Sequence, residues 1–254
     1  MRVLICTPCQ LNSAKVPYIL SLLSETSFSK GCVEHNSRQT IFDKDGKPVS
    51  HTPSYIQIGF SLLNGYSGLG RDRSIQASRA LIGGDDKVVF IDSDMSWVWE
   101  DLKELIDSHR DIVAGVVSIK DRSGRLNPTI KPEDRHCLEP EAGLTTIRGL
   151  ERIQEKYGTR EIAVTVTGTA FMAISRNALE KMAPLADPFF HTGNHAESAM
   201  QCYNFFPTGP LNNIYFGEDW GLCKLAHDAG FEVFINPDIR PKHIGDATYE
   251  VDPK

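Results

Sequence analysis

The chain has 254 residues, of which 41% are hydrophobic and 24% charged, and its formal net charge is −6. This length suffices for a sizeable buried core, and no apolar run reaches the roughly 18 residues that a membrane-spanning helix needs. The acidic balance argues against a nucleic-acid binder, which would carry a basic surface, whereas a bound metal can supply positive charge for a phosphorylated ligand. We therefore expect a soluble, cytoplasmic protein without a transmembrane segment that binds no nucleic acid.

Apolar strands alternate with helical patterns along the chain, which is typical of an α/β fold. The first half predicts strands over 2–7, 55–61, 87–91 and 112–117, and helices over 14–26, 73–82 and 98–109. Asp45-Gly46 is a candidate hairpin turn, and Gly83-Gly84 is a candidate helix C-cap. The continuous apolar run over 87–91 predicts a central parallel strand that is buried on both faces.

The second half has fewer regular patterns. It predicts strand character over 162–174, helices over 176–182 and 218–229, a strand over 231–235 and an extended tail over 237–243. The stretches 121–160 and 184–213 predict long loops, and loops of that length are usually functional or mobile. No linker or repeat interrupts the pattern, so we expect a single domain over 1–254 with a mixed, mostly parallel central sheet flanked by helices.

The cysteines do not indicate a disulfide scaffold, because six of them are scattered over the whole chain. Cys6-Thr7-Pro8-Cys9 has the spacing of a redox motif, but such a motif needs an activated thiol at the start of a helix. Here Cys6 ends a predicted strand. We expect a buried Cys6 next to a loop Cys9 rather than redox activity.

The strongest functional signal is Asp92-Ser93-Asp94, directly after the buried strand over 87–91. In an open parallel sheet, ligands bind beyond the carboxyl ends of the strands. Mg²⁺ and Mn²⁺ prefer oxygen ligands and usually bind one or two carboxylates together with substrate phosphates. This placement favours a metal and phosphate site over the alternative, a polar loop in which Asp94 or Ser96 caps the next helix.

Further candidates lie downstream. Glu218 and Asp219 open a helix, where they either complement the helix dipole or bind and deprotonate an acceptor hydroxyl. A lone histidine such as His243 is more often structural, and it becomes a candidate ligand if the fold brings it to Asp94. Four aromatic residues either line an acceptor groove or pack their loop onto the core: Phe189, Phe190, Tyr203 and Phe206.

The motifs follow one another along the chain in a defined order. In chain order they are Thr7-Pro8, Arg73 in a helix, Phe90-Ile91-Asp92-Ser93-Asp94, Thr167-Gly168-Thr169-Ala170-Phe171, Gly217-Glu218-Asp219-Trp220 and His243. This series resembles the GT-A fold glycosyltransferases, and it is most similar to the family-2-like transferases of bacteria, phages and large viruses. The resemblance implies a GT-A (Rossmann-like) fold with a nucleotide-binding part over about 1–120 and an acceptor-binding part over about 121–254. The resemblance also implies the cytoplasm of a virus-infected host cell as one place where the protein could act.

On the donor side, the resemblance implies a role for each matched residue. Asp94 is the expected direct ligand of Mn²⁺ or Mg²⁺, with Asp92 as its water-mediated or ribose-binding partner and His243 as the third metal-site residue. The residues expected to hold the nucleotide are Thr7 and Pro8 against the base, Arg73, Asp92, Ser93 and Asp94.

On the acceptor side, the resemblance implies that Asp219 is the catalytic base, with Glu218 beside it. Trp220 is the expected sugar-stacking platform, and Gly168 and Thr169 are the expected neighbours of the acceptor.

The implied reaction moves a hexosyl or deoxyhexosyl group from a UDP- or GDP-linked sugar to a hydroxyl of a glycan, glycoconjugate or other acceptor. The Glu-Asp pair favours inversion, because single displacement requires a base near the acceptor. One alternative is a sugar nucleotidyltransferase, but the Gly-rich, Arg- or Lys-containing loop that such enzymes carry after the first strand is absent from residues 7–12. The other is a nucleotide-sugar or carbohydrate-binding module without turnover.

Overall fold

A computed structural model describes residues 1–9, 57–64, 68–120, 125–138, 145–192, 199–211, 213–245 and 248–250. The helix predicted over 14–26 and the candidate turn at Asp45-Gly46 lie outside these residues. Within them, no helix is long and apolar enough to cross a membrane.

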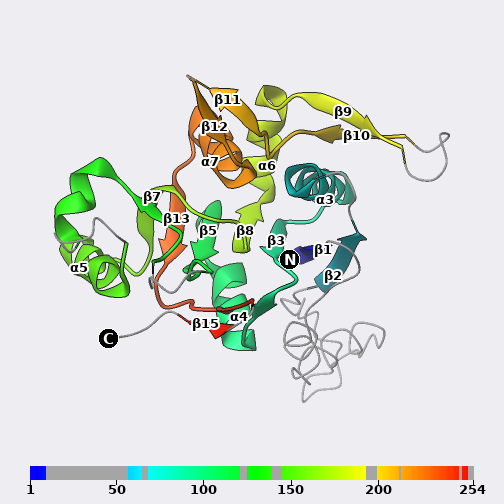
Figure 1. The fold of residues 1–254 in the computed structure, drawn as a ribbon. Coiled ribbons are helices and arrows are strands. Elements are labelled where there is room, and N and C mark those ends of the chain that lie inside the picture. Colours follow the sequence, from blue (N-terminus) through cyan, green and yellow to red (C-terminus); the bar gives the residue numbers. More distant parts are fainter. Residues whose placement is uncertain are drawn as a thin grey trace, which may run out of the picture.

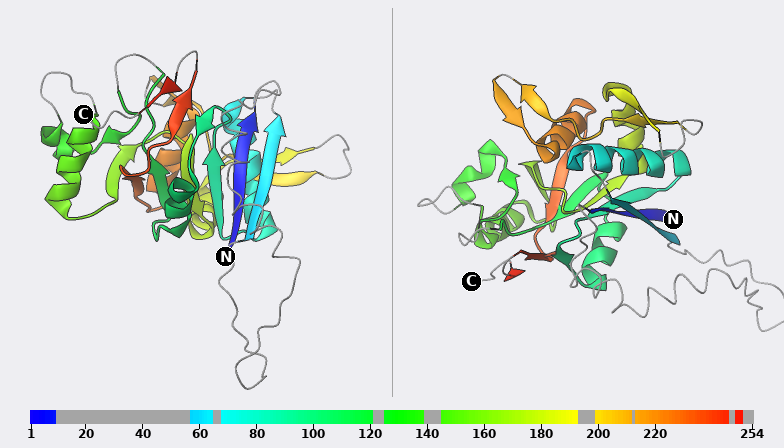
Figure 2. Two further views of the ribbon diagram at one scale, coloured as in Figure 1. Left: turned by 90° about the horizontal axis from the view of Figure 1, so that it is seen from below. Right: turned by 45° about the vertical axis from the view of Figure 1, so that its right-hand side comes forward.

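An eight-stranded sheet forms the centre of the described fold, in the order β2-β1-β3-β8-β5-β13-β7-β6 (Figure 1). Its strands are β1 (Arg2–Cys9), β2 (Gln57–Asn64), β3 (Lys87–Ile91), β5 (Ile112–Gly115), β6 (Thr129–Ile130), β7 (Ile162–Val166), β8 (Phe171–Ser175) and β13 (Val233–Asn236). β1 pairs in parallel with β2 and β3, and β5 pairs in parallel with β13, whereas β8 and β7 run antiparallel to both of their neighbours. The common direction of β1 and β2 is visible in the left view of Figure 2. The predicted mixed sheet, with most strands in one direction, is confirmed.

Helices cover both faces of this sheet. They are α3 (Leu69–Gly83), α4 (Trp99–Asp107), α5 (Ile147–Tyr157), α6 (Arg176–Met182) and α7 (Glu218–Asp228). Because successive strand residues point to opposite faces, Val88 and Phe90 join one apolar core with α3, α5, α6 and α7. Val89 and Ile91 join a second core with α4, which lies on the other side of the sheet in Figures 1 and 2. The layers are therefore helices, sheet and helix.

Smaller elements surround the carboxyl edge. Two hairpins, β9 (Pro188–His191) with β10 (Met200–Tyr203) and β11 (Gly209–Leu211) with β12 (Ile214–Phe216), precede α7. A separate three-stranded sheet joins β4 (Met95–Ser96), β14 (Lys242–Ile244) and β15 (Thr248–Tyr249). The 3₁₀ helices are η1 (Pro132–Cys137) and η2 (Ala183–Leu185). The tail predicted over 237–243 is thus tied to the segment that follows Asp94.

Several predictions of local structure were wrong. The loop predicted over 121–160 contains α5, whose Thr146 hydroxyl accepts a hydrogen bond from the Gly149 N–H at 3.2 Å and whose end is a left-handed Gly158. The loop predicted over 184–213 contains part of η2, the β9–β10 hairpin and the first strand of the β11–β12 hairpin. The predicted strand over 162–174 is two strands that are not neighbours, because the chain leaves the sheet edge between β7 and β8.

Two other details differ from the prediction. The strand over 87–91 has the predicted bounds, but β3 is parallel to only one neighbour, because β8 runs against it. Helix α3 begins at Leu69 rather than 73, and its predicted C-cap is confirmed, since Gly84 adopts a left-handed conformation. Cys6 is buried, and this burial raises the pKa of its thiol, as expected for a structural cysteine.

Candidate active site

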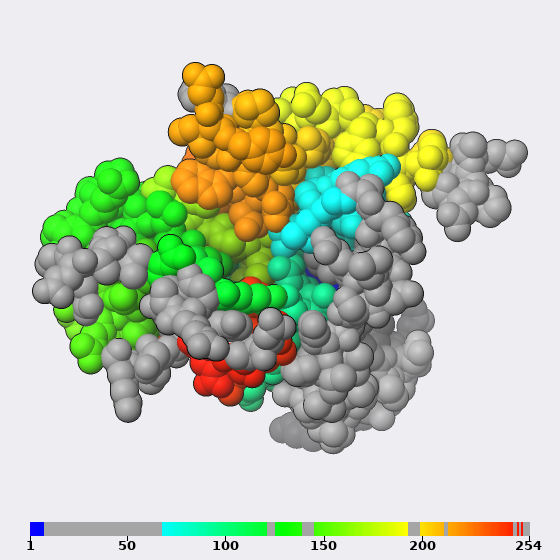
Figure 3. Space-filling model, viewed as in Figure 1, coloured from blue at the N-terminus to red at the C-terminus, as the bar shows by residue number. Residues whose placement is uncertain are grey.

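The candidate site lies at the edge of the sheet where the parallel strands end. Thr7 near the end of β1 and Asp92 directly after β3 lie at this edge, together with the chain that enters β8. The Asp92 N–H donates to the Ala170 carbonyl at 3.0 Å, which extends the pairing of β3 and β8 past the last strand residue. Figure 3 shows a recess on this side of the molecule, between the cyan atoms of α3 and the orange atoms of α7.

Arg73 binds three carboxylates from two other elements. Its Nη2 lies 2.7 Å from Asp92 Oδ1, and its Nη1 lies 3.1 Å from Glu218 Oε1 and 3.2 Å from Asp219 Oδ1. Arg73 is 1% exposed, so it cannot turn outward to water. Burial alone would lower the pKa of Arg73, but the three carboxylates outweigh burial and raise it. Arg73 therefore joins the end of β3 to the start of α7 as a permanent cation.

Asp219 is held from a second direction by the chain before β8. Its Oδ1 accepts hydrogen bonds from the Thr169 backbone N–H at 3.2 Å and from the Thr169 hydroxyl at 2.5 Å. Burial raises the pKa of Asp219, while the Arg73 charge and the Thr169 hydroxyl act in the opposite direction. A carboxylate with a raised pKa and a fixed orientation can accept a proton, which is the property that a general base needs.

A second cluster forms around Asp94. Its carboxylate contacts the Lys120 ammonium group, and its Oδ1 lies 3.6 Å from His243 Nε2. Strand pairing brings His243 here, because β14 lies antiparallel to β4 and the Ile244 N–H donates to the Asp94 carbonyl at 2.8 Å. Burial alone would raise the pKa of Asp94, but His243 and Lys120 lower the pKa to about 2. Asp94 is therefore ionised at neutral pH.

The His243 ring is oriented for a ligand on its Nε2 side. Its Nδ1 lies 3.0 Å from the Ser118 carbonyl oxygen, which can only accept, so Nδ1 carries a proton. With Nδ1 bound to this carbonyl, Nε2 is the ring nitrogen left for a ligand, and it lies 3.6 Å from Asp94 Oδ1. Metal-binding histidines commonly donate their other ring N–H to a carbonyl in this way. The Asp94 and His243 pair therefore fits a divalent cation.

The three predicted metal ligands do not form one group. Asp92 pairs with Arg73 and not with His243. Among the residues that the structure describes, no group of three or more His, Cys, Asp or Glu side chains converges on a point. Asp94 and His243 are the two that the fold brings together, and Mg²⁺ is usually bound by one or two protein carboxylates with phosphates and water completing its shell.

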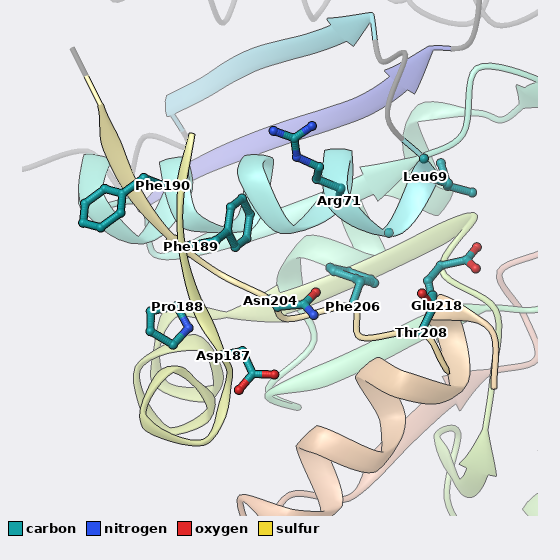
Figure 4. Close-up of a pocket in the computed structure, with 12 residues that line it drawn as sticks. Leu69, Arg71, Asp187, Pro188, Phe189, Phe190, Asn204, Phe206, Thr208 and Glu218 are labelled. Carbon is teal, nitrogen blue, oxygen red and sulfur yellow. The ribbon is translucent and has the colours of Figure 1, made fainter. Parts of the chain in front are cut away.

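A cavity of about 640 Å³ opens beside this site, between the start of α3, the β9–β10 hairpin and the segment that precedes β11 (Figure 4). Glu218 lies at one end of it, and Phe189 and Phe190 lie at the other. Phe206 also lines the cavity although it is 1% exposed, since its ring packs edge-on against Phe90 at 5.2 Å. Tyr203 instead packs against the core and does not line this cavity.

Trp220 faces a different cavity. It is 43% exposed, it lies 5.5 Å from the Phe216 ring, and it lines a neighbouring space of about 280 Å³. Thr208 lines both cavities and stands between them. A sugar on Trp220 would therefore lie beside the cavity that Glu218 lines, rather than in it.

The remaining predicted site residues differ in burial and in their contacts. Thr7 and Thr169 are 1% and 0% exposed, and the Thr169 hydroxyl donates to Asp219, so its expected place beside the acceptor stays a prediction. Gly168 allows a close approach, because a Cβ atom there would lie 2.5 Å from the Asn127 side chain. The side chain of Pro8 lies outside the described residues, and Ser93 is half-buried in the turn between the aspartates.

The sequence prediction missed two contributions. Lys120 follows β5 and reaches Asp94, and its place near the carboxyl end of a predicted strand was the available signal. Ser74 and Ser78 of α3 attach the chain that lines the larger cavity, because Ser74 Oγ accepts from the Phe206 N–H at 3.1 Å and Ser78 Oγ accepts from the Tyr203 N–H at 3.0 Å. Nothing in the sequence indicated that these helix serines bind the backbone of the later segment.

The fold is thus an α/β fold of the GT-A type, as predicted. Among solved structures it is similar to the crystal structure of A197 from STIV, with a TM-score of 0.51 and 15% identity over 100% of this chain and 96% of that chain. A weaker likeness relates 70% of this chain to 78% of HddC from Yersinia pseudotuberculosis, with a TM-score of 0.32 and 12% identity. Neither protein-family models nor curated proteins match the sequence. At this identity the first likeness establishes the fold alone.

Proposed function

We propose that the protein is a metal-dependent glycosyltransferase that moves a sugar from a UDP- or GDP-linked donor to a hydroxyl of an acceptor. The observation that carries the proposal is the joining of two motifs far apart in the sequence, since Arg73 links Asp92 of the Asp-x-Asp motif to Glu218 and Asp219. Donor-side and acceptor-side carboxylates therefore share one edge of the sheet, where ligands of such folds bind.

The charge balance supports a divalent cation. Four carboxylates, those of Asp92, Asp94, Glu218 and Asp219, face two basic side chains, Arg73 and Lys120. This leaves two negative charges that a divalent ion would neutralise, and the diphosphate of the donor would bind to the same ion. Mn²⁺ or Mg²⁺ held by Asp94 and His243 would stabilise the charge on the departing diphosphate.

In the proposed reaction each group has one role. The acceptor oxygen forms a bond with the anomeric carbon, while the bond from that carbon to the diphosphate oxygen breaks and its electron pair leaves with UDP or GDP. Asp219 takes the hydroxyl proton, and Glu218 binds the acceptor at the cavity end that it lines. With the base on the acceptor side, the displacement inverts the anomeric centre.

Thermal shift measurements test the proposal. UDP or GDP at about 100 times its dissociation constant should stabilise the protein by about 2.7 kcal/mol, but only with Mn²⁺. For a chain of this size we expect a rise in Tm of about 5–10 °C. Asp94→Asn and His243→Ala should remove the Mn²⁺-dependent part, and Asp107→Asn on the surface of α4 should retain it. Stabilisation that needs no metal and persists in Asp94→Asn would contradict the site.

Two activity assays separate the alternatives. A transferase should slowly hydrolyse its nucleotide-sugar with Mn²⁺, whereas a binding module would bind the donor without turnover. A nucleotidyltransferase would instead release pyrophosphate from a nucleoside triphosphate and a sugar 1-phosphate.

A further inference from the structure

The larger cavity reaches Glu218, which precedes the proposed base Asp219 in the chain, so its lining constrains what the acceptor can be. Glu218 borders the cavity and also contacts Arg73 Nη1 at 3.1 Å. The floor at this end is closely packed, because a Cβ atom on Gly70 would lie 2.8 Å from the Phe206 carbonyl oxygen and 3.1 Å from Glu218 Cβ. A ligand in the cavity therefore reaches Glu218 at its inner end.

The charges of the lining disfavour an anionic ligand. Arg71 is the one cation among the described residues that line the cavity, and the carboxylate of Asp187 opposes it, while the carboxylate of Glu218 is paired with Arg73. A phosphorylated lipid, a nucleotide or an acidic glycan would bring negative charge to a wall whose described residues have no unpaired positive charge to receive it.

The pattern of polar and apolar groups also disfavours a hydrocarbon chain. Asp187, Asn204, Thr208 and Glu218 are distributed along the cavity (Figure 4). A lipid tail in contact with these groups would take them out of water without returning hydrogen bonds, which is unfavourable for each group. The phenylalanine rings of the lining lie among these polar groups. Such rings pack favourably against the C–H faces of a ligand and do not form hydrogen bonds with its polar groups.

We infer that the acceptor is a neutral oligosaccharide that lies along this cavity, with its sugar rings on Phe189 and Phe190 and its reactive hydroxyl at Glu218. Sugars have hydroxyl edges for the polar groups and C–H faces for aromatic rings, so they satisfy both parts of the lining. A volume of about 640 Å³ is in the range for ligands larger than one sugar ring. This inference rests on the proposed function, and it identifies the substrate class of the same site.

Saturation-transfer NMR tests the inference in the presence of UDP or GDP and Mg²⁺, which is diamagnetic and does not broaden the ligand signals. The probes are neutral trisaccharides (maltotriose, chitotriose and mannotriose), their monosaccharides, and dodecyl phosphate as an anionic lipid analogue. At least one trisaccharide should bind at least about tenfold more tightly than its monosaccharide, and dodecyl phosphate should not compete with it. Phe189→Ala should weaken trisaccharide binding by about tenfold.

Two further variants make the result interpretable. Phe190 is 69% exposed, so Phe190→Ala should fold normally and still weaken trisaccharide binding. This variant keeps the test decisive if Phe189→Ala does not fold. Tyr215 is a 73% exposed aromatic residue on the adjacent hairpin, outside the cavity, and Tyr215→Ala should bind the trisaccharide as the wild type does.

The outcomes separate this inference from the function on which it rests. If UDP and GDP fail to bind with Mn²⁺, the proposed function is wrong. If a nucleotide binds but no trisaccharide does, or if monosaccharides bind equally well, or if dodecyl phosphate competes, the acceptor inference is overturned while the donor site stands.

Discussion

Replacing Arg73 distinguishes a residue that holds the site together from one that binds the nucleotide. The resemblance to glycosyltransferases implies the second role, whereas the structure shows Arg73 occupied by Asp92, Glu218 and Asp219. Arg73→Met keeps most of the aliphatic volume but leaves three carboxylates without their cation. Arg73→Lys keeps the charge but cannot present a planar fork to groups on two different elements.

The magnitude follows from burial. Removing one partner of a buried ion pair costs about 3–5 kcal/mol, because the other charge is left uncompensated. The Arg73 side chain is 2% exposed, but its partners are 22%, 24% and 34% exposed, so water can reach the orphaned carboxylates. We therefore expect the lower end, about 3 kcal/mol for Arg73→Met, and a fall in Tm of about 6–12 °C. Arg73→Lys should lie between this variant and the wild type.

The assay compares the stability of the free protein with its affinity for the nucleotide. Calorimetric unfolding without ligand should show the loss in Tm, and titration of UDP or GDP with Mn²⁺ at low temperature should change the dissociation constant by less than about threefold. Arg79→Met on the same helix is the matched control, since Arg79 is partly exposed and outside the cluster. An unchanged Tm together with a tenfold loss of affinity would refute the reasoning and restore the nucleotide-binding role.

Two further predictions concern stability. Gly221→Ala should destabilise the protein by about 1–3 kcal/mol in urea unfolding, because its Cβ would lie 1.8 Å from the Pro207 carbonyl oxygen, whereas Gly217→Ala meets nothing within 4 Å and should have little effect. Burial raises the pKa of Asp101 to about 6, above about 3.9 in the unfolded chain, so the folded state binds the extra proton and stability should fall as pH rises from about 4 to about 6. Asp101→Asn should remove this pH dependence and Glu100→Gln should not; equal slopes in both variants would rule out Asp101 as its source.

The sequence predicted the elements whose pattern is local and strong. The apolar run of β3 and the helical spacing of α4 and α6 appeared where they were expected, because burial of a strand or of one helix face leaves a direct pattern in the residues. β8 could not be placed in the sheet, since its insertion between β3 and β5 depends on tertiary pairing. Short hairpins such as β9–β10 depend on contacts with α3 that no local pattern records.

The site residues divide in the same way. The sequence identified Asp92, Asp94, Glu218 and Asp219, because acids at the end of a buried strand and at the start of a helix are conspicuous. Their partners could not be predicted, since the bonds of Arg73 to Glu218 and Asp219 span 145 and 146 residues.

The spacing of the Asp-x-Asp motif explains how one short segment can serve both halves of the site. Asp92 directly follows β3, and its carboxylate binds Arg73 of α3. Arg73 in turn binds Glu218 and Asp219. The Asp92 carbonyl then accepts a hydrogen bond from the Met95 N–H at 3.1 Å, which closes a turn. Because of this turn, Asp94 faces Lys120 and His243 instead of Arg73. The two aspartates therefore have different neighbours. A change at Asp92 should act on Glu218 and Asp219 through Arg73, whereas a change at Asp94 should act on the neighbouring Lys120 and His243 and, under the proposed function, on the cation.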